Sequence, residues 1–289
     1  MEKKILITGK NSYIGMSFIH YCQNENLDFI IDELNLHDDW KINDFSQYET
    51  IFHVAGIAHN SADPKLEELY YSINRDLTIE VAQKAKSEGV KQFIFMSSMI
   101  VYGNKSGGKT FVTPDTKPNP DNFYGDSKLQ AEIGLEKLND DKFKVVILRP
   151  PMIYGKGSKG NYPLLAKLSR RTPIFPNYPN NRSMLHIDNL CELIRLLIIN
   201  EESGTFYPQN AELVQTSEMV RLIAKLNKHD ILFTKIANPV IKVFLKLTLI
   251  KKVFGDLYYL PSMSNYDKGD YQIRHFEQSI MLTERDDDV

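Results

Sequence analysis

The sequence contains few cysteines, no excess of either charge and no long apolar run. Cys22 and Cys191 are its only cysteines among 289 residues, too few for a disulfide framework or a cysteine metal site, which predicts a reducing cytoplasmic setting. The formal net charge of −2 provides no basic footprint for nucleic acid. No apolar run reaches the roughly 18 residues of a spanning helix, so no transmembrane segment is predicted. The first apolar run, after Lys4, is too short for a signal peptide.

Buried-strand patterns alternate with helical periodicity over the first two thirds of the chain. The strand-like runs cover residues 4–9, 27–31, 50–56, 90–98 and 143–149. This alternation predicts an α/β fold, a Rossmann-type doubly wound parallel sheet. We expect a dinucleotide-binding domain over 1–155, with 186–210 packing back onto it. Residues 156–289 are then mainly a smaller, C-terminal substrate-binding region.

A tight loop joins the first strand to the first helix. Gly9, Ser12 and Gly15 have the spacing of a dinucleotide-binding glycine pattern, with serine at the middle position. Serine is small enough for a pyrophosphate to approach, and the helix amino terminus supplies N–H groups and a favourable dipole. The loop therefore predicts phosphate binding, although an ordinary strand–helix turn has the same appearance.

An acidic residue follows the second strand. Asp32 stands about 20 residues past the loop, where an adenine-ribose diol is gripped. No lysine or arginine follows closely to receive a 2′-phosphate, which favours NAD over NADP. An exposed strand end also often carries an aspartate.

Polar and small residues end the later strands. Small residues follow His53, and Ser98 lies at the strand end that faces a ligand crevice in a parallel sheet. Asn74 lies inside a helical pattern, either exposed or kept for a polar contact. Tyr124 and Lys128 are one helical turn apart, so they share a face, and a nearby cation favours a phenolate.

These features, in this order, resemble the extended short-chain dehydrogenase/reductase family, whose members modify nucleotide sugars. The resemblance covers nearly the whole chain and is weakest after about residue 210. It implies that Ser98 donates a hydrogen bond to the reacting sugar oxygen. It also implies that Tyr124 is the general acid/base, and that Lys128 holds the nicotinamide ribose and lowers the tyrosine pKa.

The resemblance also implies the residues that bind NAD or NADP and a UDP-sugar. The cofactor set is Gly9, Ser12, Tyr13, Ile14, Gly15, Asp32, Ala55, Gly56, Asn74, Tyr124, Lys128 and Pro151. For the substrate, Arg182 matches an arginine that meets the nucleotide diphosphate, Asn161 matches a contacting asparagine, and Ser98 contributes its hydroxyl. No metal is expected. Family members are often homodimers through paired helices, here 64–87 and 124–138.

Departures from the family pattern narrow the expected chemistry. Met99 and Ile100 replace the acidic pair of dehydratases, so 4,6-dehydration is not expected. Met152 stands where epimerases usually carry an asparagine. The resulting hypothesis is reduction of a UDP-4-keto-6-deoxy-N-acetylhexosamine at C4 for polysaccharide precursor synthesis. The alternative is a 4-epimerase of UDP-glucose or UDP-N-acetylglucosamine, which Asp32 favours slightly. A non-catalytic nucleotide sensor is a remote third.

One apolar segment has no place in this scheme. Residues 239–254 are strongly apolar with interspersed lysines. They are interpreted as a buried helix pair with snorkelling lysines in preference to a helix lying on a membrane surface.

Overall fold

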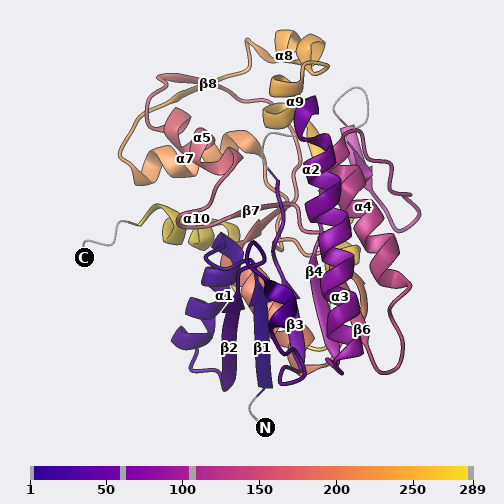
Figure 1. Cartoon of the computed structure of the whole chain (residues 1–289). Coiled ribbons are helices and arrows are strands. Elements are labelled where there is room, and N and C mark those ends of the chain that lie inside the picture. Colours follow the sequence, from indigo (N-terminus) through magenta and orange to yellow (C-terminus); the bar gives the residue numbers. More distant parts are fainter. Residues whose placement is uncertain (1–2, 59–62, 104–108, 286–289) are drawn as a thin grey trace.

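The central sheet has six strands in chain order: β1 (Lys3–Thr8), β2 (Phe29–Leu34), β3 (Thr50–His53), β4 (Gln92–Met96), β6 (Lys144–Leu148) and β10 (Gly204–Phe206). The computed structural model describes residues 3–58, 63–103 and 109–285. Across the sheet the order is β10-β6-β4-β3-β1-β2, with every pairing parallel (Figure 1). All six carboxyl ends therefore lie at one edge. The predicted parallel α/β sheet is confirmed.

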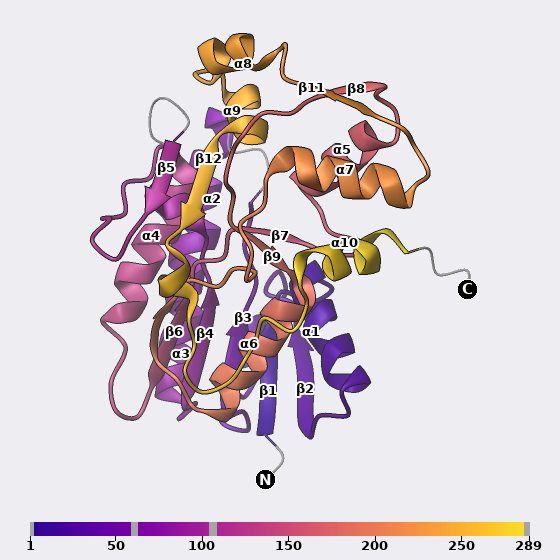
Figure 2. The ribbon, with the colours of Figure 1, turned by 180° about the vertical axis from the view of Figure 1, so that it is seen from behind.

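Helices cover both faces of the sheet. On one face α1 (Tyr13–Asn24) packs with α6 (Ile187–Ile199), which Figure 2 shows lying across the strands. On the other face lie α3 (Thr78–Ser87) and α4 (Phe123–Glu136). Strands covered on both sides are mostly apolar, as in other parallel sheets: Ile51, Phe93 and Val146 are fully buried.

The segment predicted as one helix over 64–87 is helical but irregular. A 3-10 turn (Pro64–Leu66) leads into α2 (Glu67–Tyr71), a π-helix (Ser72–Leu77) and then α3. A π-turn widens a helix locally and is frequent at functional sites. Here it contains Asn74, which is fully buried.

The second half of the chain builds a smaller part beyond the carboxyl edge of the sheet (Figure 1). Three short parallel strand pairs lie outside the central sheet: β7 (Met152–Tyr154) with β9 (Met184–His186), β8 (Ile174–Pro176) with β11 (Leu232–Thr234), and β12 (Asp256–Tyr259) with β5 (Lys109–Val112), which comes from the first half of the chain. The helices of this part are α5 (Asn161–Ser169), α7 (Thr216–Leu226), α8 (Asn238–Phe244), α9 (Thr248–Phe254) and α10 (Phe276–Glu284). Further 3-10 turns occur at Trp40–Ile42, Met99–Tyr102 and Pro261–Ser264.

The apolar segment 239–254 forms two short helices, α8 and α9, that are buried on one side only. Ile241 is 6% exposed and packs in the core of the C-terminal part, whereas Val243 is 71% exposed. The predicted fully buried pair is therefore wrong for the outward side of α8. Among the described residues, no helix is long and apolar enough to cross a membrane.

A buried ion pair joins α4 to the sheet. The Arg149 guanidinium, at the end of β6, donates to the Glu132 carboxylate at 2.6 Å, and the two side chains are 9% and 1% exposed. The Ser97 hydroxyl also donates to Glu132, and Arg149 donates to the Tyr102 hydroxyl at 2.8 Å. Every charge in this cluster is thus paired, as burial requires.

Replacing Glu132 with alanine leaves the Arg149 charge buried without its partner. We expect a loss of about 3–5 kcal/mol in the free energy of unfolding, the usual effect of breaking a buried pair. Denaturant unfolding followed by fluorescence measures it. Glu136→Ala, at an exposed position of the same helix, is the matched control and should change stability by less than about 0.5 kcal/mol. Equal losses in both variants would show that the pair does not hold α4.

Candidate functional site

Tyr124 and Ser98 meet at the carboxyl edge of the sheet. Asn122 caps α4 by accepting from the Gly125 N–H at 2.9 Å, which places Tyr124 in the first turn. Ser98 follows β4 and is hydrogen-bonded to the Tyr124 side chain. Burial raises the pKa of Tyr124 to about 12, the Ser98 bond opposes that rise, and Tyr70 adds to it. The phenol is therefore protonated at neutral pH in the ligand-free protein.

Lys128 lies one turn further along α4 and is buried. Its Nζ donates to the Met96 carbonyl at 2.8 Å and lies 4.7 Å from the centre of the Phe95 ring. Burial lowers the pKa of Lys128 to about 8, and the nearby Glu132 carboxylate opposes this shift. In the ligand-free protein the ammonium is thus bonded to the end of β4. The predicted lowering of the Tyr124 pKa by Lys128 is not seen in the ligand-free protein, where the pKa of Tyr124 is raised and the groups that shift it are its burial, Ser98 and Tyr70.

Asn74 reaches the same region from the π-helix. Its Oδ1 accepts from the Ile57 N–H at 2.9 Å, and its Nδ2 donates to the Ile57 carbonyl at 3.0 Å and the Ser127 hydroxyl at 3.2 Å. The sequence left open whether Asn74 is exposed or makes a polar contact, and the structure shows the polar contact. Asn74 fixes the chain that leaves β3 against the first turns of α4.

The glycine loop is shaped by close backbone approach. Gly9 has φ of +97°, and a Cβ there would lie 2.9 Å from the Ala55 N. Ser12 caps α1 by accepting from the Gly15 N–H at 3.2 Å. A Cβ on Gly56 would lie 2.9 Å from Asn74 Oδ1 and 3.1 Å from Lys128 Nζ. The loop after β1 thus approaches the backbone that follows β3 closely at Gly9, and the free N–H groups of a helix amino terminus open beside it, as a dinucleotide pyrophosphate requires.

The acidic side chain that reaches this loop is Glu33. Its Oε1 accepts from the Asn11 N–H at 3.0 Å. Asp32 is bonded elsewhere: it accepts from the Tyr48 hydroxyl at 2.8 Å and lies 3.8 Å from Lys4 Nζ. The strand was predicted to end at Asp32–Glu33, and β2 runs one residue further, to Leu34. Successive side chains of a strand point to opposite faces, so neighbouring carboxylates diverge.

Asn161 and Arg182 line one small cavity in the C-terminal part. Arg182 donates from Nη1 to the Gly255 carbonyl at 3.0 Å, and burial lowers its pKa while Asp256 opposes the shift. Lys252 of α9 also lines this cavity and was not predicted, since its place in an apolar segment indicated snorkelling. The other lining residues are Met152, Leu165, Met184, Val214, Thr216, Met219 and Val253.

The remaining predicted residues lie between these two regions. Pro151 follows β6 in the segment whose Pro150 carbonyl accepts from the Met99 N–H at 2.9 Å. Pro151 therefore stands beside the 3-10 turn that follows Ser98. Tyr13 and Ile14 open α1, and the buried Tyr13 hydroxyl has no hydrogen-bond partner in the described part of the chain.

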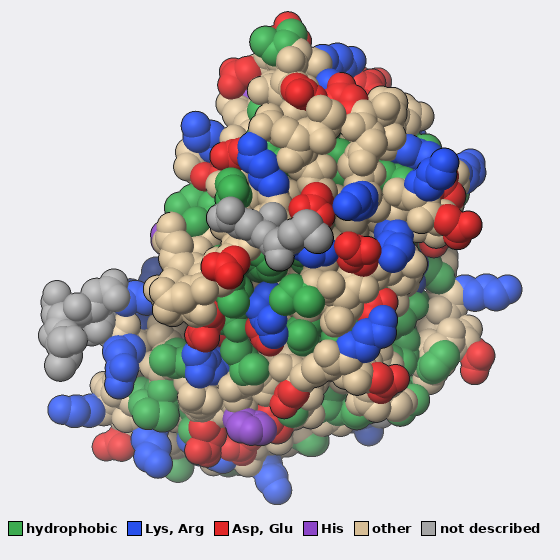
Figure 3. Space-filling model, turned by 90° about the horizontal axis from the view of Figure 1, so that it is seen from below, with side chains coloured by type: hydrophobic (Ala, Val, Ile, Leu, Met, Phe, Trp, Pro, Cys, Tyr) green, Lys and Arg blue, Asp and Glu red, His purple; other side chains and the backbone are tan. Residues whose placement is uncertain are grey.

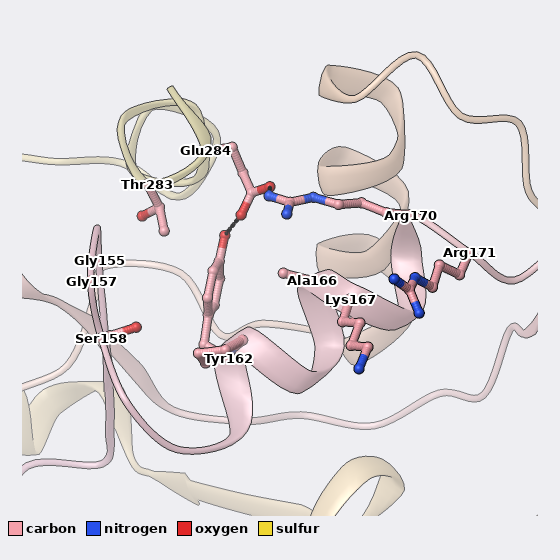
Figure 4. A pocket seen from close by; sticks show the side chains of 11 residues that line it. Gly155, Gly157, Ser158, Tyr162, Ala166, Lys167, Arg170, Arg171, Thr283 and Glu284 are labelled. Carbon is pink, nitrogen blue, oxygen red and sulfur yellow. Dashed lines mark hydrogen bonds and ion pairs between the residues drawn. The ribbon is translucent and has the colours of Figure 1, made fainter. Parts of the chain in front are cut away.

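A wider pocket of about 470 Å³ lies apart from Ser98, Tyr124 and Lys128, between α5, α10 and the loop after β7 (Figure 4). The Glu284 carboxylate accepts from the Tyr162 hydroxyl at 2.9 Å and from Arg170 at 2.6 Å. Figure 4 shows Lys167 and Arg171 pointing away from this carboxylate. The negative charge of Glu284 is therefore already neutralised by Arg170, which also lines the pocket.

The structure thus combines a parallel sheet, a glycine loop after β1, and Ser98, Tyr124 and Lys128 near the end of β4. This combination is typical of dinucleotide-binding α/β enzymes. Residues 5–207 match the sequence model of the NAD dependent epimerase/dehydratase family, and the chain belongs to this family. The resemblance to the extended short-chain dehydrogenase/reductases is thereby confirmed. Its Ser, Tyr and Lys are all present and placed at one edge of the sheet.

Two curated relatives are epimerases. UDP-glucose 4-epimerase from Vibrio cholerae is 32% identical over 250 residues, which cover 78% of this chain and 76% of that protein. N-acetyl-alpha-D-glucosaminyl-diphospho-ditrans,octacis-undecaprenol 4-epimerase from Escherichia coli O157:H7 is 30% identical over 162 residues, covering 54% of this chain and 47% of that protein. The chain thus spans about three quarters of the first relative and about half of the second.

Solved structures share the fold at lower identity. RMD from Pseudomonas aeruginosa, complexed with NADPH, has a TM-score of 0.76 at 16% identity, with 98% of both chains covered. MoeE5 in complex with UDP-glucose and NAD has a TM-score of 0.71 at 17% identity, with 97% of both chains covered. These neighbours hold NAD or NADPH, the two cofactors that the sequence predicted.

The pKa of Lys128 predicts how stability varies with pH. Its pKa in the folded protein, about 8, lies below its ordinary value of 10.5, so between these values the unfolded chain binds more protons. The free energy of unfolding should therefore rise with pH between about 8 and 10.5. Below pH 8 the cost of burying the charged Lys128 is fully present. Lys128→Met should abolish this rise and be no less stable at pH 7. Denaturant midpoints from pH 7 to pH 10 measure both.

Lys137→Met, an exposed lysine of the same region, is the control and should keep the wild-type pH profile. A lower midpoint of Lys128→Met at pH 7 would show that the bond to the Met96 carbonyl outweighs the burial of the charge.

Proposed function

We propose that this protein is an NAD-dependent 4-epimerase of a hexose carried on a diphosphate, with UDP-hexose as the first substrate class. The observation that carries the proposal is the hydrogen-bonded Tyr124–Ser98 pair beside the buried Lys128. Its support from relatives is the match to a UDP-glucose 4-epimerase over about three quarters of each chain.

The chain's own residues supply acid–base catalysis and orientation. As a phenolate, the form that the Lys128 ammonium would favour in the loaded site, Tyr124 would take the proton of the sugar C4 hydroxyl as general base and return it as general acid. Ser98 holds the same oxygen in line with the phenol. The Lys128 ammonium is the positive charge beneath the site. Its neighbour His53 adds none, because burial lowers the pKa of His53 to about 3. Bound NAD would accept the C4 hydride and return it to the opposite face of the sugar.

The residues around the glycine loop fit the cofactor. Gly9, Ser12, Gly15, Ala55 and Gly56 would border the pyrophosphate, with the amino terminus of α1 opposite its charge. Glu33, in place of the predicted Asp32, would grip the adenine ribose, because its carboxylate already faces the loop. A carboxylate there repels a 2′-phosphate, which favours NAD over NADP.

The small cavity supplies the charge for a diphosphate. Arg182 and Lys252 are cations that line it together with the Asn161 amide. Two cations and a neutral donor suit the two phosphates between a sugar and its carrier. This chemistry is shared by nucleoside diphosphate sugars and by the polyprenyl diphosphate sugar that the Escherichia coli relative's name specifies.

A 4-ketoreductase of a UDP-4-keto-6-deoxy-N-acetylhexosamine, in polysaccharide precursor synthesis, is the second candidate. Met152, which lines the small cavity, favours it, because epimerases that resemble this chain usually carry an asparagine there. The two functions are separated by cofactor balance. An epimerase interconverts C4 isomers without net consumption of nicotinamide, whereas a reductase consumes it in proportion to product.

Removing the phenol of Tyr124 tests the catalytic assignment. Tyr124→Phe should lower turnover of UDP-glucose to UDP-galactose, or of the N-acetyl pair, by about 10²–10⁴-fold, the usual contribution of a positioned acid/base. NAD affinity should stay within about twofold. Chromatography of the sugar nucleotides measures turnover, and fluorescence titration measures NAD binding.

Tyr71→Phe, which removes another phenol close to α4, is the matched control and should retain turnover. Unchanged turnover in Tyr124→Phe would contradict the mechanism. Stoichiometric loss of NADH or NADPH with a 4-keto sugar would favour the reductase.

Neighbouring carboxylates test the cofactor assignment. Glu33→Gln should weaken NAD binding by about tenfold and narrow the preference for NAD over NADP, because the ribose loses a charged acceptor. Asp32→Asn is the matched control: its side chain is bonded to Tyr48, so NAD affinity should stay near wild type. Titration of both cofactors against both variants is the measurement, and the opposite ranking would restore Asp32 to the ribose site.

A further inference from the structure

Helix α8 presents an uncovered apolar stripe. Val240, Val243 and Phe244 are 57%, 71% and 48% exposed and are spaced i, i+3 and i+4, so they share one face. Two further exposed apolar residues flank the helix: Ile236 in the turn before it, 87% exposed, and Leu247 in the linker to α9, 54% exposed. These five residues are called the α8 stripe.

The opposite side of α8 is what holds it to the protein. Ile241 and Leu245 are each 6% exposed and belong to the core of the C-terminal part. The contacts of this buried face attach α8 to the protein, and the α8 stripe takes no part in them. A row of large apolar side chains kept in water is unfavourable, which indicates a binding role.

The charge around the stripe is of one sign. Residues 231–255 contain five lysines and no aspartate or glutamate. Lys235, Lys242 and Lys246 are exposed, and none of them forms an ion pair with a carboxylate in the described part of the chain. Lys242 lies on α8 between the residues of the stripe, and Lys246 lies just after the end of the helix. By contrast, basic and acidic side chains are mixed on the opposite end of the molecule, seen from below in Figure 3.

An apolar stripe flanked by lysines fits an anionic lipid surface. In such a complex the apolar side chains enter the boundary between head groups and acyl chains while the lysines meet the phosphates. A second copy of the chain fits less well, since a two-fold interface on this face would bring lysines against lysines. We propose that the α8 stripe, with Lys235, Lys242 and Lys246, docks the protein on the surface of an anionic phospholipid bilayer.

Docking would hold the small cavity next to the lipid. Helix α9 follows α8 directly, and its Lys252 and Val253 line the cavity that contains Arg182. Both views place α8 and α9 together at the end of the molecule far from the amino terminus (Figures 1 and 2). This placement suits a sugar diphosphate carried on a membrane lipid. That extension rests on the proposed function, whereas the docking does not.

Vesicle flotation of the purified full chain tests the proposal. The protein should float with vesicles containing phosphatidylglycerol and stay unbound with pure phosphatidylcholine, and added salt should weaken binding. Removing the three lysines as Lys235→Gln, Lys242→Gln and Lys246→Gln should lower binding about a hundredfold, at roughly fivefold for each lysine near the surface. The double variant Val243→Asp, Leu247→Asp should lower it at least tenfold. Ile42→Asp, 79% exposed elsewhere, is the control and should bind like wild type.

Three results would overturn the proposal. They are failure of the wild type to float with anionic vesicles, equal binding of the stripe variants and the control, and a dimer in light scattering that the stripe variants dissociate. Circular dichroism checks that the variants are folded. Turnover of soluble UDP-hexose by the stripe variants should equal wild type, so a failure of docking is distinguishable from a failure of the proposed function.

Discussion

The arrangement of the site depends on the buried carboxylate of Glu132. It accepts hydrogen bonds from Ser97 at the end of β4 and from Arg149 at the end of β6. Glu132 lies one turn after Lys128, so α4 is held against both strand ends at a fixed register. A buried carboxylate without these partners would be strongly unfavourable. The ion pair therefore brings Tyr124 to the strand edge on which Ser98 stands.

Around this anchor the site is built mainly from backbone groups and neutral side chains. Asn74 binds both main-chain groups of Ile57, and His53 is hydrogen-bonded to Thr8 at 2.8 Å and Thr78 at 3.0 Å. Because burial keeps His53 neutral, the charge next to it is that of Lys128. A single cation with a lowered pKa can respond to a bound ligand, since a new hydrogen-bond acceptor would favour its charged form.

The C-terminal part divides its surface between two tasks. Its inner side lines the cavity with Arg182 and Lys252, and its outer side carries the α8 stripe. Helices α8 and α9 are in contact, and α8 carries the stripe whereas α9 lines the cavity. The cations of one short segment thus serve a candidate diphosphate site and a candidate lipid-facing surface, which explains why the segment carries no acidic residue.

The sequence by itself determined the parallel sheet, the loop from Gly9 to Gly15 and the shared face of Tyr124 and Lys128, because these follow from local periodicity and spacing. The family resemblance named Asn161 and Arg182 as substrate-contacting residues, and the structure shows both lining one small cavity. Only the tertiary structure showed that the Glu33 carboxylate reaches the loop whereas Asp32 is bonded to Tyr48, since neighbouring side chains of a strand point to opposite faces. It alone showed the π-turn around Asn74, whose partners are distant in sequence. It also uncovered the α8 stripe, because periodicity separates the faces of a helix but does not say which face the rest of the protein covers.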